Sequence, residues 1–165
     1  MGNLFSNLQR IKPQGLKIFN LLKSSEDIIN LGVGEPDFKT PKHIVKATKI
    51  ALEEGLTSYT PSTGLPELRV AISEKVNKEN KIRCSRDDVC VTVGGTQGLF
   101  ATLSALDVRE VLLPTPAFSA FKPTILLSGG TVREVPLSRE DGFKLKAEDL
   151  EKRITRKSNI LILNS

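Results

Sequence analysis

The segment VTVGGTQGLF has the residue types and spacing of a phosphate-binding turn. An apolar run at residues 89–93 ends in Gly94 and Gly95, and a helical pattern begins at Thr96. Two glycines let the backbone turn sharply, so the amides of Gly95, Thr96 and Gln97 would point out of the positive end of a helix. A plain strand-to-helix turn can also use two glycines, and the segment lacks both the GxGxxG register and a following GKS or GKT. The residues alone therefore leave a phosphate cradle and a plain turn both open.

A second segment, LPTPAFSAF, places Phe118 just beyond the end of another strand-like run. Its ring could stack on a planar ligand or could belong to the core. Ser119 and Lys122 form an SxxK pattern, which positions a serine nucleophile in penicillin-binding enzymes. A KTG segment and a convincing SxN partner are missing, and Pro123 follows directly. We therefore do not expect a serine nucleophile here.

The remaining candidate groups indicate no mechanism. His43 is the single histidine, falls in the first turn of a predicted helix and has no cysteine near it in the sequence. Ser/His/Asp and Cys/His mechanisms would have to use this one position, which we predict to be a surface residue. Glu35 and Asp37 flank Pro36 and are typical of a turn. We assign no catalytic and no metal-binding residue in this chain.

The elements that would position these groups follow from the periodicity of the apolar residues. Helices are predicted over residues 14–23, 41–54, 65 to about 77–80, 96–105, 118–127 and 147–153. Strands are predicted over residues 89–93, 110–113, 131–135 and 159–163, and an extended segment over residues 28–31. Thr40 would cap the second helix and Gly55 would end it. Strands that alternate with helices predict an α/β fold with a largely parallel sheet, in which ligands bind beyond the carboxyl ends of the strands.

The composition is that of an ordinary globular domain, with 165 residues, 39% hydrophobic and 26% charged. No apolar stretch approaches the roughly 18 to 20 residues of a membrane-spanning helix, so we expect no membrane role. The net charge is +5 and residues 1–24 contain no acid, but no aromatic residues interleave with the basic ones, so we expect no nucleic-acid partner. The MGNLFS start is only a permissive match to a myristoylation signal, and no convincing transit peptide is present. Cys84 and Cys90 match no zinc or disulfide framework and predict reduced thiols and a cytoplasmic location.

Four segments in order, INLGVGEPDFKTP, LTSYTPSTGLPELR, VTVGGTQGLF and LPTPAFSAF, resemble the class I and II aminotransferases. These are pyridoxal 5′-phosphate-dependent enzymes of fold type I, and the resemblance extends from IKPQGLKIF to LILNS. It implies a truncated α/β protein of that fold type. Residues 1–40 would be the N-terminal arm and part of the small domain, and residues 41–165 would be the first half of the large domain.

The resemblance also implies roles for particular residues. The cofactor would be held by Gly95, Thr96, Gln97, Phe118 and Tyr59. The first three would hold its phosphate through their amides, and the Phe118 ring would stack on its pyridine ring. Tyr59 would reach the phosphate bound by the neighbouring subunit, which implies a homodimer. The backbone of Gly34 would contact the α-carboxylate of the substrate, where a side chain would obstruct close approach.

The family continues beyond the segments found here. Relatives go on to a PNNPTG-like segment, the aspartate that pairs with the pyridinium nitrogen, the Schiff-base lysine and the arginine that binds the substrate carboxylate; Lys122, in SAFKP, does not match that lysine. We therefore expect the N-terminal portion of an aminotransferase that moves an amino group between an amino acid and a 2-oxo acid, inactive alone and with unpaired strand edges. A lyase or synthase of the same fold stays open as an alternative. So does a non-catalytic fragment that associates with a partner subunit.

Overall fold

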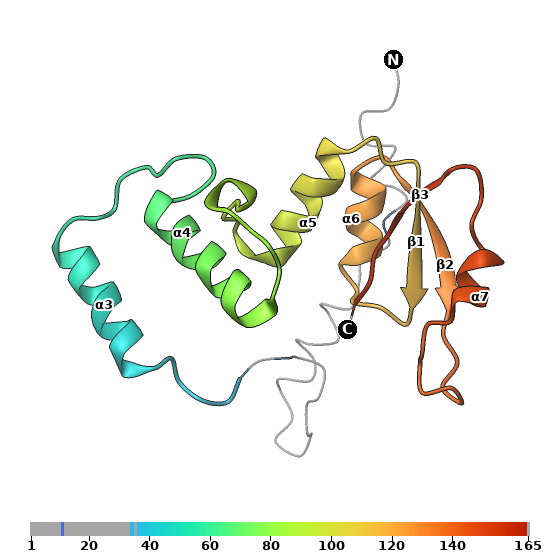
Figure 1. Cartoon of the computed structure of the whole chain (residues 1–165), viewed down its shortest axis with the longest axis horizontal. Helices are drawn as coiled ribbons and strands as arrows, with labels where there is room; N and C mark the ends of the chain where they lie inside the picture. The colour runs from blue at the N-terminus through green and yellow to red at the C-terminus, as the bar shows by residue number, and fades with distance from the viewer. Residues whose placement is uncertain (1–10, 12–33, 35, 165) are drawn as a thin grey trace. The chain divides into compact units, whose positions relative to one another are not determined.

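A computed structural model describes residue 11, residue 34 and residues 36–164 of the chain (Figure 1). The described residues form two compact units, which divide between Val91 and Thr92. We call residues 34 and 36–91 the helical unit and residues 92–164 the sheet unit, and each is described by itself. The helix predicted at residues 14–23 and the extended segment predicted at residues 28–31 lie outside the described residues.

The helical unit contains α3 (Lys42–Glu53), α4 (Pro66–Lys75), a π-helical turn (Val76–Asn80) and a 3-10 turn (Arg86–Asp88). Gly55 follows α3 with φ +72°, a left-handed conformation that glycine adopts without strain, so its predicted role as the helix stop is confirmed. The predicted start is wrong by one residue. Pro41 rather than Thr40 is the N-cap, because its ψ of 138° is not helical, and α3 begins at Lys42.

The strand predicted at residues 89–93 is wrong, because the segment is not paired in a sheet in this structure. Val89 does have extended dihedrals, φ −108° and ψ 127°. The N–H of Val91, however, donates to the carbonyl oxygen of Thr63 at 2.9 Å, in the turn-rich connector before α4. A strand requires a ladder of hydrogen bonds to a neighbouring strand, and one bond to a turn does not supply it.

The sheet unit alternates helices and strands. In chain order these are α5 (Gly94–Ala105), β1 (Glu110–Thr115), α6 (Phe121–Leu127), β2 (Thr131–Pro136), α7 (Ala147–Glu151) and β3 (Ser158–Leu161). The strands lie in the order β2-β1-β3, and β1 pairs in parallel with both neighbours. The predicted α/β architecture with a parallel sheet is thereby confirmed.

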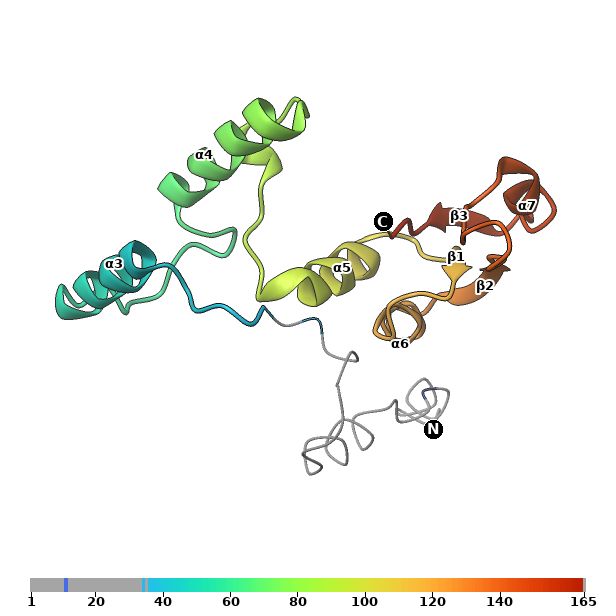
Figure 2. The same ribbon diagram turned by 90° about the horizontal axis from the view of Figure 1, so that it is seen from below.

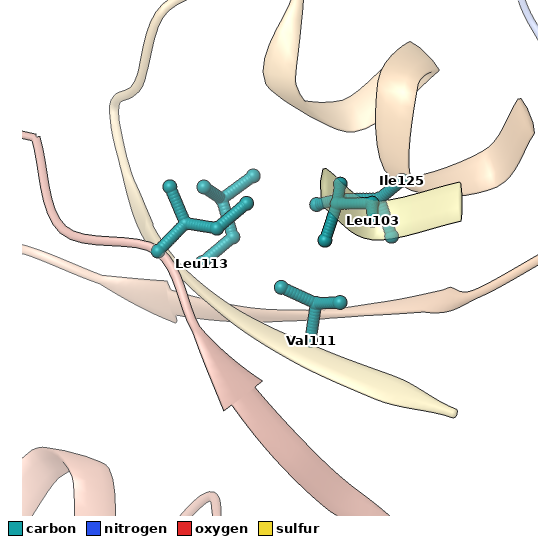
Figure 3. Packing of buried hydrophobic residues seen from close by; sticks show 5 residues of the cluster. Leu103, Val111, Leu113 and Ile125 are labelled. Atoms are coloured by element: carbon teal, nitrogen blue, oxygen red, sulfur yellow. The ribbon is translucent and has the colours of Figure 1, made fainter. Parts of the chain in front are cut away.

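The core lies between one face of this sheet and the helices α5 and α6. Val111 and Leu113 of β1 point to this face and pack with Leu103 of α5 and Ile125 of α6 (Figure 3). Leu112, between them in the strand, is also buried but points to the opposite face, because successive side chains alternate. The two views show α6 and α7 on opposite sides of the sheet (Figures 1 and 2). Burial on both faces explains why β1 reads as a continuous apolar run.

The helix predicted at residues 118–127 begins three residues later, at Phe121. The reason is Pro123, which has no N–H to donate and is tolerated only in the first turn of a helix. A helix starting at Phe118 would place Pro123 in its interior and remove a backbone hydrogen bond. Phe118 therefore lies in the loop between β1 and α6, just past the carboxyl end of the central strand.

Candidate functional site

The turn that leads into α5 is held by its own hydrogen bonds. Gly94 has φ +74°, and its N–H donates to the carbonyl oxygen of Thr92 at 2.9 Å. The hydroxyl of Thr92 donates in return to the carbonyl oxygen of Gly94 at 3.1 Å. The side-chain oxygen of Gln97 accepts the N–H of Val93, which is the N-cap residue. Glycine is favoured at position 94 because a residue with a Cβ is strained at this φ.

The first turn of α5 has the chemistry of an anion-binding site. The helix starts at Gly94, two residues before the predicted Thr96, so the N–H groups of Gly95 and Thr96 have no acceptor within the helix. No acidic residue lies in this turn, and the helix dipole adds positive potential there. A Cβ built on Gly95 meets no heavy atom within 4 Å, so the space beside this backbone is open. The turn therefore fits the close approach of a phosphate or carboxylate.

A hollow of about 290 Å³ adjoins this turn within the sheet unit. Its lining comes from α5 and from the loop and first turn after β1, and consists of Gly95, Thr96, Leu99, Phe118, Ala120 and Phe121. The structure thus brings together Gly95, Thr96 and Phe118, three residues from segments about 20 positions apart that the family resemblance assigns to one site. Leu99 and Phe121 were missed. Their signal is helical spacing, because Leu99 follows Gly95 by one turn and Phe121 follows Phe118 at i+3.

The aromatic wall of the hollow is a pair of rings. The centroids of Phe118 and Phe121 are 5.6 Å apart and the ring planes meet at 78°, an edge-to-face arrangement. Phe118 is 56% exposed, so it is not a core residue, and the core interpretation that the sequence left open is wrong. Phe121 is partly buried and packs against the core of the sheet unit. An exposed aromatic face next to free amides suits a ligand with both a planar ring and an anionic group.

The other residues predicted for the site lie elsewhere. Gln97 does not line the hollow, and its side chain is engaged with Val93. Tyr59 and Gly34 belong to the helical unit, where Tyr59 is fully exposed and a Cβ on Gly34 would meet nothing within 4 Å. The predicted binding roles of all six residues stay predictions. For pyridoxal 5′-phosphate, the sheet unit offers amide donors and an aromatic face of the required kinds.

Among the described residues, the carboxylate with the largest pKa shift lies at the opposite end of β1 from the hollow. Glu110 begins β1 and accepts hydrogen bonds from Ser158 Oγ at 2.6 Å, Thr155 Oγ1 at 2.7 Å and Arg133 Nη2 at 3.0 Å. These bonds, Ser158 first, lower the pKa of Glu110 from 4.5 to about 2. The hollow adjoins the other end of the strand, after Thr115. Glu110 therefore connects the beginnings of three parallel strands and does not contribute to the hollow.

Other candidate groups are occupied or exposed. The Nζ of Lys122 donates to Glu134 Oε1 at 2.7 Å, which ties α6 to β2 and leaves the SxxK pattern without a free amine. His43 is exposed on α3, as predicted. Cys84 and Cys90 are free thiols. In the part of the chain that the structure describes, no helix has the length and apolar character needed to cross a membrane.

Comparisons with known proteins identify relatives of this chain. The sequence profile of the family "Aminotransferase class I and II" matches residues 26–165. The chain is 46% identical over 162 residues to the aspartate aminotransferase of Pyrococcus abyssi, covering 96% of this chain and 42% of that protein. It is 41% identical to aromatic-amino-acid aminotransferase 2 of Thermococcus litoralis, covering 98% of this chain and 43% of that protein.

Solved structures show the same likeness. The aspartate aminotransferase from Thermus thermophilus with maleate matches with a TM-score of 0.90 and 36% identity, over 100% of this chain and 45% of that one. The chain thus spans less than half the length of these relatives. The profile match covers most of the chain, and the same fold is found at substantial sequence identity. This chain belongs to the class I and II aminotransferase family.

Proposed function

We propose that this chain is the phosphate- and ring-binding portion of a pyridoxal 5′-phosphate-dependent aminotransferase. The enzyme would move an amino group between an amino acid and a 2-oxo acid. The observation that carries the proposal is the hollow in which the open N-terminus of α5 meets the exposed ring of Phe118. Family membership supports the reaction class. The relatives are named for both aspartate and aromatic amino acids, so the proposal is not narrowed to one substrate.

Each predicted residue has a physical role in this proposal. The free amides of Gly95 and Thr96 donate to the phosphate, where the helix dipole adds attraction. Gln97, which the resemblance places in the same turn, supports the turn by accepting the N–H of Val93 with its side chain. The ring of Phe118 presents an apolar face to the pyridine ring, which excludes water from it. The backbone of Gly34 approaches the substrate carboxylate. When bound, the cofactor supplies an electron sink for the substrate's α-carbon.

We further propose a homodimer in which Tyr59 reaches the phosphate site of the partner subunit. Full exposure of Tyr59 supports this proposal, because its hydroxyl is accessible to a second chain. A cytoplasmic location is proposed from the two free thiols. We also propose that these 165 residues alone transfer no amino groups, since the resemblance assigns the Schiff-base lysine to a segment not among them.

The cofactor site can be tested on the purified chain by titration with pyridoxal 5′-phosphate, following backbone amide signals by NMR. The amides of Gly95, Thr96 and Gln97 are expected to shift together and to saturate. Two controls are included. Pyridoxal, which lacks the phosphate, should shift the α5 amide signals little, and pyridoxal 5′-phosphate should shift the amide signals of α7 little. After borohydride reduction, mass spectrometry should find no stoichiometric adduct. Shifts spread evenly over the chain, or none at all, would contradict a phosphate site at α5.

The reaction class requires a separate experiment. In the aspartate aminotransferase of Pyrococcus abyssi, the 162 aligned residues would be replaced by the corresponding part of this chain. A folded chimera is expected to transfer amino groups to a 2-oxo acid. A chimera with native-like circular dichroism that binds the cofactor but only eliminates or condenses substrates would favour the lyase or synthase alternative. One that binds the cofactor and shows no reaction would contradict the proposal.

A further inference from the structure

The position of Phe118 in the chain would by itself restrain its ring poorly. Phe118 lies in the loop between β1 and α6, outside both elements, and more than half of its surface is exposed. An exposed side chain on a loop samples several rotamers, and binding then has to fix one of them. A contact with another residue must restrain the Phe118 ring if the ring is to be oriented for a ligand before binding.

The structure supplies that restraint three residues later. The ring of Phe121 meets the ring of Phe118 edge to face, with centroids 5.6 Å apart and planes at 78°. Phe121 is the first residue of α6, which fixes its backbone. Its side chain packs against the buried cluster that includes Val111 and Ile125, both fully buried. Phe121 thus connects the rigid core of the sheet unit to the exposed ring at the hollow.

We propose that Phe121 is a positioning residue that orients Phe118 for a planar ligand ring. This inference rests on the proposed function, because it assumes that Phe118 meets the pyridine ring of pyridoxal 5′-phosphate. The geometry explains why both rings line one hollow with the amide donors of Gly95 and Thr96. The amides are fixed by α5, and Phe121 fixes the aromatic face in the same way, so both halves of the site are formed before the ligand arrives.

The inference predicts an effect on ring binding but not on phosphate binding. Edge-to-face pairs contribute a free energy that corresponds to about two- to tenfold in affinity. Phe121→Leu keeps an apolar side chain against the core and removes the ring. We expect this variant to bind pyridoxal 5′-phosphate about two- to tenfold more weakly, and inorganic phosphate within about twofold of the parent chain. Phe121→Tyr keeps the ring and is expected to restore parental affinity for both compounds.

A double-mutant cycle with Phe118→Leu separates positioning from a general structural effect. If Phe121 acts through Phe118, then Phe121→Leu should have no further effect on cofactor affinity once Phe118 is leucine. A parallel loss of affinity for pyridoxal 5′-phosphate and inorganic phosphate would overturn the inference. So would an unchanged effect of Phe121→Leu in the Phe118→Leu background.

A measurement without ligand tests the same point if the chain binds no cofactor or if Phe121→Leu folds poorly. NMR of ring-labelled phenylalanine reports the motion of the Phe118 ring in the parent chain and in the Phe121→Tyr and Phe121→Leu variants. We expect the Phe118 ring to be restrained in the parent chain and in Phe121→Tyr, and mobile in Phe121→Leu. If Phe121→Leu does not fold, the expected result is a restrained ring in the parent chain. A freely mobile Phe118 ring in the parent chain would overturn the inference. Absence of cofactor binding with a restrained ring would instead contradict the proposed function alone.

Discussion

Replacing Gly95 by alanine is expected to stabilise the chain and to weaken cofactor binding at the same time. A Cβ at this position meets no heavy atom within 4 Å, and Gly95 lies inside α5 without a positive φ. Alanine then reduces the freedom of the unfolded chain without strain, which raises the free energy of unfolding by about 0.5 kcal/mol. The new methyl group, however, occupies the open space beside the first-turn amides. Loss of one charge-assisted hydrogen bond costs about 1.5 kcal/mol or more, so affinity for pyridoxal 5′-phosphate should fall by about tenfold.

Gly94→Ala is the matched control, because the same substitution at the neighbouring glycine should lower the free energy of unfolding rather than raise it. Gly94 has φ +74°, so alanine there should lower the free energy of unfolding by about 1–2 kcal/mol. Urea denaturation gives both stabilities, and calorimetric titration with pyridoxal 5′-phosphate gives the affinities. A Gly95→Ala variant that is destabilised by more than about 1 kcal/mol would show that the space is filled. Unchanged affinity in a stable Gly95→Ala variant would refute the phosphate site at this turn.

Three further predictions concern the sheet unit. A Cβ on Gly130 would lie 2.5 Å from Val108 Cγ1, so Gly130→Ala should lower the free energy of unfolding in urea by about 1–3 kcal/mol. Adding Val108→Ala to this variant should recover part of the loss, and additive effects of the two substitutions would contradict this contact. Ile125 is fully buried, and Ile125→Ala should cost about 2–5 kcal/mol by the same measurement, whereas a loss below about 1 kcal/mol would place it outside the core. Because hydrogen bonds lower the pKa of Glu110 from 4.5 to about 2, its carboxylate stabilises the fold fully above about pH 4.5, and this stabilisation is lost as the pH falls toward 2. Glu110→Gln should therefore lose less stability than the parent chain between about pH 5 and about pH 2.5 in urea titrations, and equal losses would argue against the shifted pKa.

Local patterns in the sequence predict most elements of the two units. The apolar run of β1 and the glycine that ends α3 depend on neighbouring residues, and both are observed. The start of α6 differs from the prediction because Pro123 is tolerated only in the first turn of a helix, which the aromatic pattern before it does not show. The segment at residues 89–93 has the composition of a strand, but strand formation depends on a partner that no local pattern reveals. Its backbone hydrogen bonds here go to neighbouring turns, as from the Val91 N–H to the carbonyl oxygen of Thr63.

Some features of the candidate site likewise follow from the sequence, and others only from the tertiary structure. The sequence determines the glycine turn before α5, because a φ of +74° at Gly94 strains any residue with a Cβ. It also determines the family through the order of four motifs. Only the tertiary structure decides that Phe118 is exposed beside that turn rather than buried, and that Phe121 meets its ring. The physical reason is that exposure and ring geometry depend on the packing of α5 and α6 against one sheet face. That packing joins residues that are distant in sequence, whereas turns and periodicities involve only neighbours in the chain.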